Sequence, residues 1–163
     1  MTKGDTYRVE RRIHVDAPPA VVHERVVDLH RWTSWSPWED LDPDQERRYG
    51  GAEQGVGAWY AWRGNRKAGQ GRMEIVGADE STVTIDLQFV KPFKSRSTTA
   101  FELRPDGDGT LVTWTMTGPN TAMLRLMGLF TSMDKLIGPD FEKGLQRLKA
   151  DAEAADGSTP SAT

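Results

Sequence analysis

The sequence predicts an α+β fold in which a curved antiparallel sheet of seven strands surrounds a long C-terminal helix, with two short helices after the first strand. Three observations predict this fold. Short segments that alternate apolar with polar residues occur at the N-terminus and again between residues 45 and 118. Helical patterns follow the first of these segments. Apolar residues then recur at three- and four-residue steps through the last third of the chain.

The first strand is predicted at residues 7–15. Val9, Ile13 and Val15 share one face there, and mostly charged residues occupy the other. Arg11 lies among the apolar positions, and we interpret it as an edge residue or as a partner in an ion pair, in preference to a catalytic group.

A helix is predicted from Pro19 to about His30. The preceding Asp16-Ala-Pro-Pro motif places prolines at the helix start, where the first N–H groups need no partner. The apolar positions at helical spacing are Val22, Val26 and Leu29, and the positions assigned to solvent are Glu24, Arg25 and Asp28.

A second, shorter helical turn is predicted within residues 31–39, where three tryptophans recur every three residues. Pro37 prevents a long helix from continuing. We expect Trp35 and Trp38 to pack against the body of the domain, because two large exposed rings would be costly.

Six further strands are predicted because Gly, Asp and Asn clusters separate segments of alternating residues. Their expected ranges are 45–50, 56–63, 69–77, 81–90, 94–104 and 110–118. The alternation assigns to the inner face Tyr60, Trp62, Met73, Ile75, Val83, Ile85, Leu87, Phe89, Phe101, Leu103, Val112, Trp114 and Met116. The outer face is expected to carry Arg72, Glu74, Thr84, Asp86, Arg96 and Glu102.

The last third of the chain is predicted to be helical, with a kink or a brief break at Gly138-Pro139. Its apolar stripe consists of Met123, Met127, Phe130, Ile137, Phe141, Leu145 and Leu148. Residues 156–163 contain no large apolar side chain, and we expect a disordered tail there. A single domain is therefore expected at residues 7–155, after an N-terminal tail at residues 1–6.

The composition excludes several classes of protein. The chain has no cysteine, which rules out disulfides, thiolate metal sites and cysteine nucleophiles. The N-terminus lacks the apolar stretch of a signal peptide, and no apolar run is long enough to span a membrane, so we expect a soluble, cytoplasmic protein. The formal net charge is -3 with both signs mixed along the chain, which argues against a nucleic-acid partner.

The order of these elements resembles the START-like superfamily, also called the Bet v 1-like superfamily or SRPBCC, which includes the polyketide cyclase/dehydrase and lipid-transport family. Three motifs carry the resemblance over roughly residues 7 to 153: Asp16-Ala-Pro-Pro-Ala-Val-Val, Trp35-Ser-Pro-Trp38, which is similar to a motif of one bacterial branch, and Phe141-Glu-Lys-Gly-Leu-Gln-Arg-Leu-Lys149. The resemblance implies a helix-grip fold. It does not select one function, because related proteins include carriers, receptors, cyclases and chaperone cofactors.

A sheet bent around a helix is expected to enclose an apolar cavity for a small molecule. Bulky aromatic rings and adaptable thioethers suit a flat or chain-like ligand. The candidate ligand-binding residues are Trp35, Trp38, Tyr60, Trp62, Met73, Leu87, Phe89, Trp114, Met116, Met123, Met127, Phe130, Met133 and Ile137. Each of them is also a candidate for ordinary core packing. Gly71 and Ala58 are expected to form a wall of small residues.

Asp134 is the one weak catalytic candidate, because helical spacing places it on or beside the apolar stripe. Inside an apolar pocket its carboxylate would anchor a ligand or transfer protons; at the edge of the stripe it would be solvated or paired. The acidic segment Glu39–Asp44 is interpreted as a solvated loop, and His14, His23 and His30 as surface residues. No metal site and no cofactor are predicted, since ligand spacings and dinucleotide or nucleophile motifs are missing.

The leading hypothesis is the binding or transport of a lipophilic small molecule: a lipid, a polyketide or an aromatic metabolite. The first alternative is a cyclase, aromatase or dehydratase-like enzyme without metal, in which polar groups of the cavity move protons. The second is a protein interaction module with a vestigial cavity. The sequence indicates neither the ligand nor the oligomeric state.

Overall fold

The structure, a computed structural model, describes residues 6–39, 41–42, 44–66, 68–91, 94–119 and 133–157. The helices are α1 (Pro19–Val27), the 3-10 helix η2 (Leu29–Ser34) and α3 (Met133–Gly157). The strands are β1 (Thr6–Val15), β2 (Glu46–Gly50), β3 (Trp59–Arg63), β4 (Gln70–Ala78), β5 (Thr82–Lys91), β6 (Ser95–Asp106) and β7 (Gly109–Pro119). This order confirms the predicted fold class, and β3 begins three residues later than expected.

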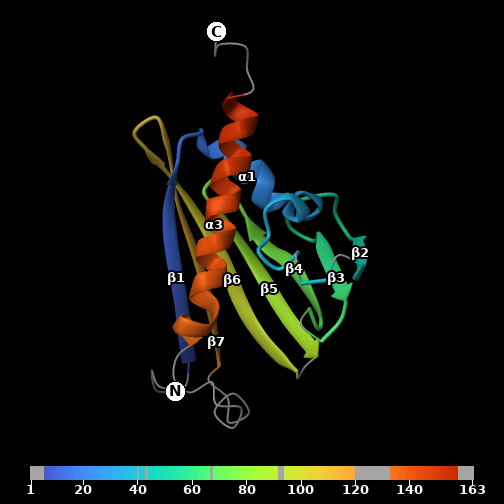
Figure 1. Ribbon diagram of the computed structural model, residues 1–163. Coiled ribbons are helices and arrows are strands. Elements are labelled where there is room, and N and C mark those ends of the chain that lie inside the picture. The colour runs from blue at the N-terminus through green and yellow to red at the C-terminus, as the bar shows by residue number, and fades with distance from the viewer. Residues whose placement is uncertain are drawn as a thin grey trace.

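The strands form one antiparallel sheet in the order β1-β7-β6-β5-β4-β3-β2. The sheet curves, and α3 lies along its concave side next to β1 while α1 and η2 lie beside the helix (Figure 1). Two register shifts interrupt the β4–β5 pair, at Gln70/Gly71 and at Ile75/Gly77. Because such irregularities bend and twist a strand, they help the sheet to close around the helix.

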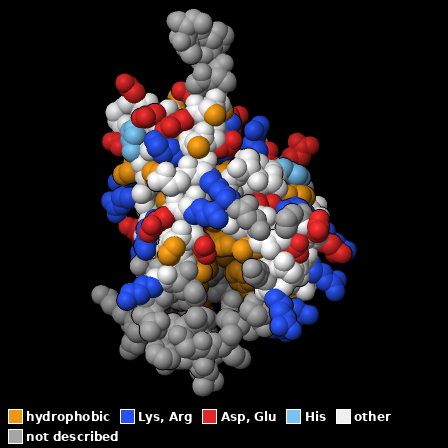
Figure 2. Space-filling model, viewed as in Figure 1, with side chains coloured by type: hydrophobic (Ala, Val, Ile, Leu, Met, Phe, Trp, Pro, Cys, Tyr) orange, Lys and Arg blue, Asp and Glu red, His pale blue; other side chains and the backbone are white. Residues whose placement is uncertain are grey.

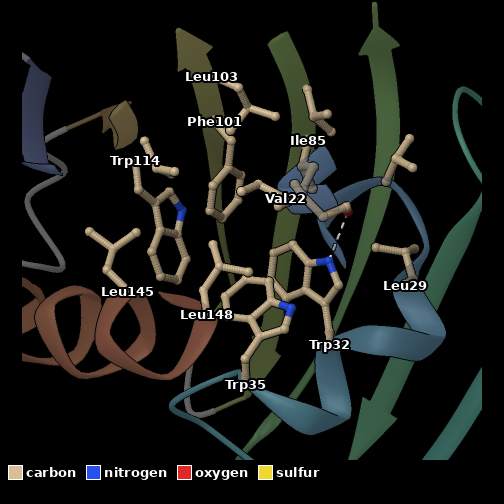
Figure 3. Packing of buried hydrophobic residues seen from close by; sticks show 14 of the residues in the cluster. Val22, Leu29, Trp32, Trp35, Ile85, Phe101, Leu103, Trp114, Leu145 and Leu148 are labelled. Carbon is tan, nitrogen blue, oxygen red and sulfur yellow. Dashed lines mark hydrogen bonds between the residues drawn. The ribbon is translucent and has the colours of Figure 1, made fainter. Parts of the chain in front are cut away.

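The core is built around tryptophans from η2 and the sheet. The Trp32 and Trp35 rings pack edge-on against Phe101 and Trp114, with centroids 5.7 to 6.3 Å apart (Figure 3). Each indole N–H finds a backbone carbonyl, since Trp32 donates to Val26 and Trp35 to Arg25, both at 2.9 Å. The three-residue spacing of these rings suits a 3-10 helix, in which residues i and i+3 share a face.

Both tryptophans of the Trp-Ser-Pro-Trp motif pack on the domain, as predicted, but to different depths. Trp35 is 0% exposed, whereas Trp38 is partly buried against the edge of the same cluster. The Trp38 ring lies edge-on to Trp114 and Phe141, at 5.7 and 6.2 Å.

The long helix α3 runs through Gly138 and Pro139 without the break that the sequence suggested. Pro139 is only the seventh residue of the helix, so it removes a single backbone hydrogen bond close to the N-terminal end. The residues that follow it are held by packing against the core. The buried positions among its described residues are Gly138, Phe141, Gly144, Leu145, Leu148 and Ala152. The predicted stripe residues Met123, Met127 and Phe130 lie outside the described residues. Of the tail predicted at residues 156–163, Asp156 and Gly157 are the last residues of α3, and residues 158–163 lie outside the described residues.

Two arginines join the first third of the chain to α3. Arg11 donates to Glu142 at 2.8 Å, which agrees with the predicted ion pair. Arg25, in contrast, was assigned to solvent and is only 7% exposed. Its Nε donates to Asp151 at 3.1 Å and its Nη1 to the Val21 carbonyl at 2.9 Å. That assignment failed because α3 packs across the face of α1 that a lone amphipathic helix would expose.

His14 connects two loops at one end of the sheet and makes stability depend on pH. Its Nδ1 lies 2.8 Å from Asp106 and its Nε2 lies 2.8 Å from Asp16. The hydrogen bond to Asp106, and then the one to Asp16, raises the pKa of the His14 imidazole above its ordinary 6.5. Protonated His14 therefore stabilises the folded protein at pH values below the pKa that His14 has in the unfolded chain. This stabilisation is lost as the pH rises through the higher pKa that His14 has in the folded protein.

We therefore predict that the urea midpoint of the protein falls between about pH 6 and about pH 8.5 by more than that of a His14→Gln variant. The matched control is His23→Gln, because His23 contacts the Asp79 backbone carbonyl instead of a carboxylate. Equal pH profiles for His14→Gln and the unmodified protein would contradict the prediction.

Candidate functional site

A cavity of about 260 Å³ lies between the inner face of the sheet, the segment from η2 to β2, and the first half of α3. Hydrophobic side chains form the floor of an opening on this side of the molecule (Figure 2). The described residues that line the cavity are Trp32, Ser36, Trp38, Glu39, Leu41, Gln45, Tyr60, Trp62, Ala68, Met73, Leu87, Phe89, Thr99, Trp114, Met116, Ile137, Asp140 and Phe141.

Stacked and edge-on rings hold the aromatic walls in place. On the β3 side, Tyr60 stacks on Trp62 at 5.8 Å, and Phe89 of β5 meets Trp62 edge-on at 5.5 Å. On the helix side, Trp114 lies parallel to Phe141 with centroids 3.9 Å apart. Strand alternation turns these sheet residues inward, and the contacts between rings fix their orientation.

The polar ends of two wall tryptophans are already satisfied within the protein. Trp62 Nε1 donates to the Ala68 carbonyl at 2.9 Å, and Trp114 Nε1 donates to Thr99 Oγ1 at 2.8 Å. With their N–H groups engaged, these indoles offer the cavity chiefly apolar surface.

Most of the predicted ligand-binding residues that the structure describes border this cavity. They are Trp38, Tyr60, Trp62, Met73, Leu87, Phe89, Trp114, Met116 and Ile137. Trp35 does not line the cavity, because its ring is fully buried in the hydrophobic core. Met123, Met127 and Phe130 lie outside the described residues. Met133 and Asp134 form the start of α3, but their side chains also lie outside the described part of the chain.

The sequence did not identify the polar part of the wall. Glu39 was interpreted as part of a solvated loop, yet its side chain is only 14% exposed. Its Oε1 accepts from Arg47 Nη2 at 2.8 Å and from Arg47 Nε at 3.1 Å. Gln45 adds a long contact to Glu39 at 3.5 Å. The ion pair becomes visible only when the structure places Arg47 of β2 beside Glu39. The sequence gives no signal for it, because neither helical nor strand periodicity relates a loop residue to a strand residue eight positions later.

Asp140 is the second carboxylate in the wall. Its Oδ2 accepts a long hydrogen bond of 3.4 Å from Trp38 Nε1, which joins α3 to the segment after η2. A weak signal existed in the sequence: Asp140 precedes the stripe residue Phe141 and follows Ile137 by three residues, which is helical spacing.

Tyr60 carries a buried hydroxyl for which no described atom completes a hydrogen bond. Burial raises the pKa of this phenol strongly, and Glu39 adds to the rise. The nearby Arg47 guanidinium lowers the same pKa, but by less than burial raises it. The phenol therefore remains protonated at all ordinary pH values.

The described residues contain neither a candidate metal site nor a candidate membrane-spanning helix. No group of three or more histidine, aspartate or glutamate side chains there is arranged to hold a metal ion. None of the described helices is both long and apolar enough to cross a membrane.

Comparison with known proteins agrees with this architecture. A family model described as polyketide cyclase / dehydrase and lipid transport matches residues 6–153. No curated protein sequence matches significantly.

Among solved structures, the di-domain ARO/CYC StfQ from the steffimycin biosynthetic pathway is similar with a TM-score of 0.69 and 12% identity, covering 95% of this chain and 53% of StfQ. Protein Ms6760 from Mycobacterium smegmatis has a TM-score of 0.63 and 16% identity, covering 91% and 92% of the two chains. The major latex-like protein 151 from Panax ginseng has a TM-score of 0.61 and 15% identity, covering 91% and 98%. At these identities the likeness concerns the fold alone.

Proposed function

Since this chain belongs to the polyketide cyclase/dehydrase and lipid transport family, we propose that it binds a lipophilic small molecule in the cavity between the sheet and α3. The candidate ligands are a lipid, a polyketide or an aromatic metabolite. One observation carries the proposal: aromatic rings, thioethers and aliphatic groups make up most of the wall of a 260 Å³ cavity. This volume is close to the lower end of the range for small-molecule pockets, about 300 Å³.

The aromatic wall supplies both the binding surface and a signal. A ligand that displaces water from Trp38, Trp62 and Trp114 gains from apolar burial and also changes their emission. The phenol of Tyr60 and the two carboxylates are the groups that would orient a polar substituent.

Binding is tested with N-phenyl-1-naphthylamine, an uncharged lipophilic dye. We expect it to quench tryptophan emission saturably, with one site for each chain. Native mass spectrometry of the freshly purified protein is expected to show a retained apolar molecule that the dye displaces. Quenching that rises without saturation, together with the absence of a retained molecule, would overturn the proposal.

A second candidate function is a cyclase, aromatase or dehydratase-like reaction, and the carboxylates of Glu39 and Asp140 in the wall favour it. Carboxylates inside an apolar cavity are suited to proton transfer at a bound chain. Asp134 remains a further candidate for this role. A carrier and an enzyme differ in one respect: in the enzyme, replacing these acids stops turnover and leaves binding intact.

A further inference from the structure

We propose that the cavity selects ligands whose polar end is a cation or a hydrogen-bond donor, a lipophilic amine above all, and discriminates against ligands that end in a carboxylate. This inference rests on the proposed binding function and specifies its ligand class.

The ionisable side chains in the cavity wall are all acidic among the described residues. Among the described lining residues, Glu39 and Asp140 are the ionisable acids, and there is no lysine, arginine or histidine. The neutral polar groups of the wall are Ser36, Gln45, Tyr60 and Thr99. A bound carboxylate would therefore face acidic side chains and no cation among these lining residues, in an apolar setting where repulsion between like charges is screened less than in water.

The two acids differ in how far their charge is already compensated. Glu39 is paired with Arg47 at 2.8 Å. Asp140 has no ion pair with a described residue, and its side chain accepts the long hydrogen bond from Trp38 Nε1 at 3.4 Å. Of the two acids, Asp140 is thus the one whose charge no described cation compensates.

Trp38 connects the aromatic part of the wall to Asp140. It precedes Glu39 in the chain, and its indole nitrogen contacts Asp140. Trp62 and Trp114 add further ring surface to the same cavity. These rings supply apolar surface for the hydrophobic part of such a ligand, while Asp140 faces its ammonium group.

Three probes with the same ring system test this selection: 2-naphthylmethylamine, 2-naphthalenemethanol and 2-naphthoate. Their affinities are compared by isothermal titration calorimetry near neutral pH and at low salt. We expect the amine to bind at least about tenfold more tightly than the naphthoate, with the alcohol between them.

The Asp140→Asn variant preserves the shape of the side chain and removes its charge. We expect it to reduce the ratio of amine to naphthoate affinity by about tenfold and to leave the affinity for the alcohol nearly unchanged. The matched control is Glu102→Gln, which removes one exposed acidic charge on β6, outside the cavity. That control is expected to keep the ratio of the unmodified protein.

The possible failures are distinguishable. If none of the three probes binds, the proposed function fails and this inference fails with it. If all three bind with similar affinity, or if Asp140→Asn leaves the ratio unchanged, the binding function stands and the selection for amines is overturned.

Discussion

Replacing Trp35 with alanine is expected to lower the free energy of unfolding by about 3–5 kcal/mol, the usual cost of deleting a large buried ring. Trp35 is 0% exposed and contacts three other rings, with centroids 4.6 Å from Trp32, 5.8 Å from Phe101 and 5.7 Å from Trp114. Its removal would leave a void among packed rings and would free the Arg25 carbonyl that now accepts from its N–H.

Urea unfolding followed by circular dichroism measures this effect. Trp38→Ala is the matched comparison, because the second ring of the same motif is only partly buried and faces the cavity. We expect a smaller loss of stability for Trp38→Ala. Equal losses in the two variants would contradict the division of the motif into one core residue and one cavity residue.

Filling the cavity is expected to weaken binding of N-phenyl-1-naphthylamine at least about tenfold without unfolding the protein. Leu41 is a suitable position, since it lines the cavity from a loop and is only partly buried. A Leu41→Trp side chain would take up part of the cavity volume, and overpacking of a cavity displaces fewer neighbours than overpacking of a filled core.

The matched control is Val76→Trp, which adds the same ring at a position on β4 that is 51% exposed. Both variants are expected to melt within a few degrees of the unmodified protein, and only Leu41→Trp should lose affinity for the dye. If the two variants bind the dye equally well, the cavity is not the binding site.

The structure also shows why the two small residues that the sequence suggested for a cavity wall do not serve this experiment. At Gly71, even a methyl group would lie 2.6 Å from the Trp62 ring and from the Gln88 carbonyl oxygen. Ala58 is 2% exposed in the core and is not among the lining residues. Larger side chains at either position would disturb the sheet before they filled the cavity.

The sequence by itself determined the fold and the inward face of most strands. Alternation with period two is a local property of the chain, so it placed Tyr60, Leu87 and Trp114 on the inner face without knowledge of what they meet there. Helical spacing likewise identified Phe141 and Leu148 as buried positions. These predictions succeeded because the pattern of apolar and polar residues next to a position is enough to assign it to the buried or the exposed face of its strand or helix.

Only the tertiary structure decided which residues on a face enter the core and which line the cavity. Trp35 and Trp38 belong to the same short motif, yet the docking of α3 and the bend of the sheet bury one ring fully and leave the other at the cavity. The sequence could not reveal the hydrogen-bond partners of the polar groups either, because these partners are far apart in the chain. Asp140 and Trp38 are 102 residues apart, and Arg25 and Asp151 are 126 residues apart. Periodicity specifies the direction of a side chain, but contacts between distant segments depend on how the elements pack, and these contacts determine the charge of the cavity wall.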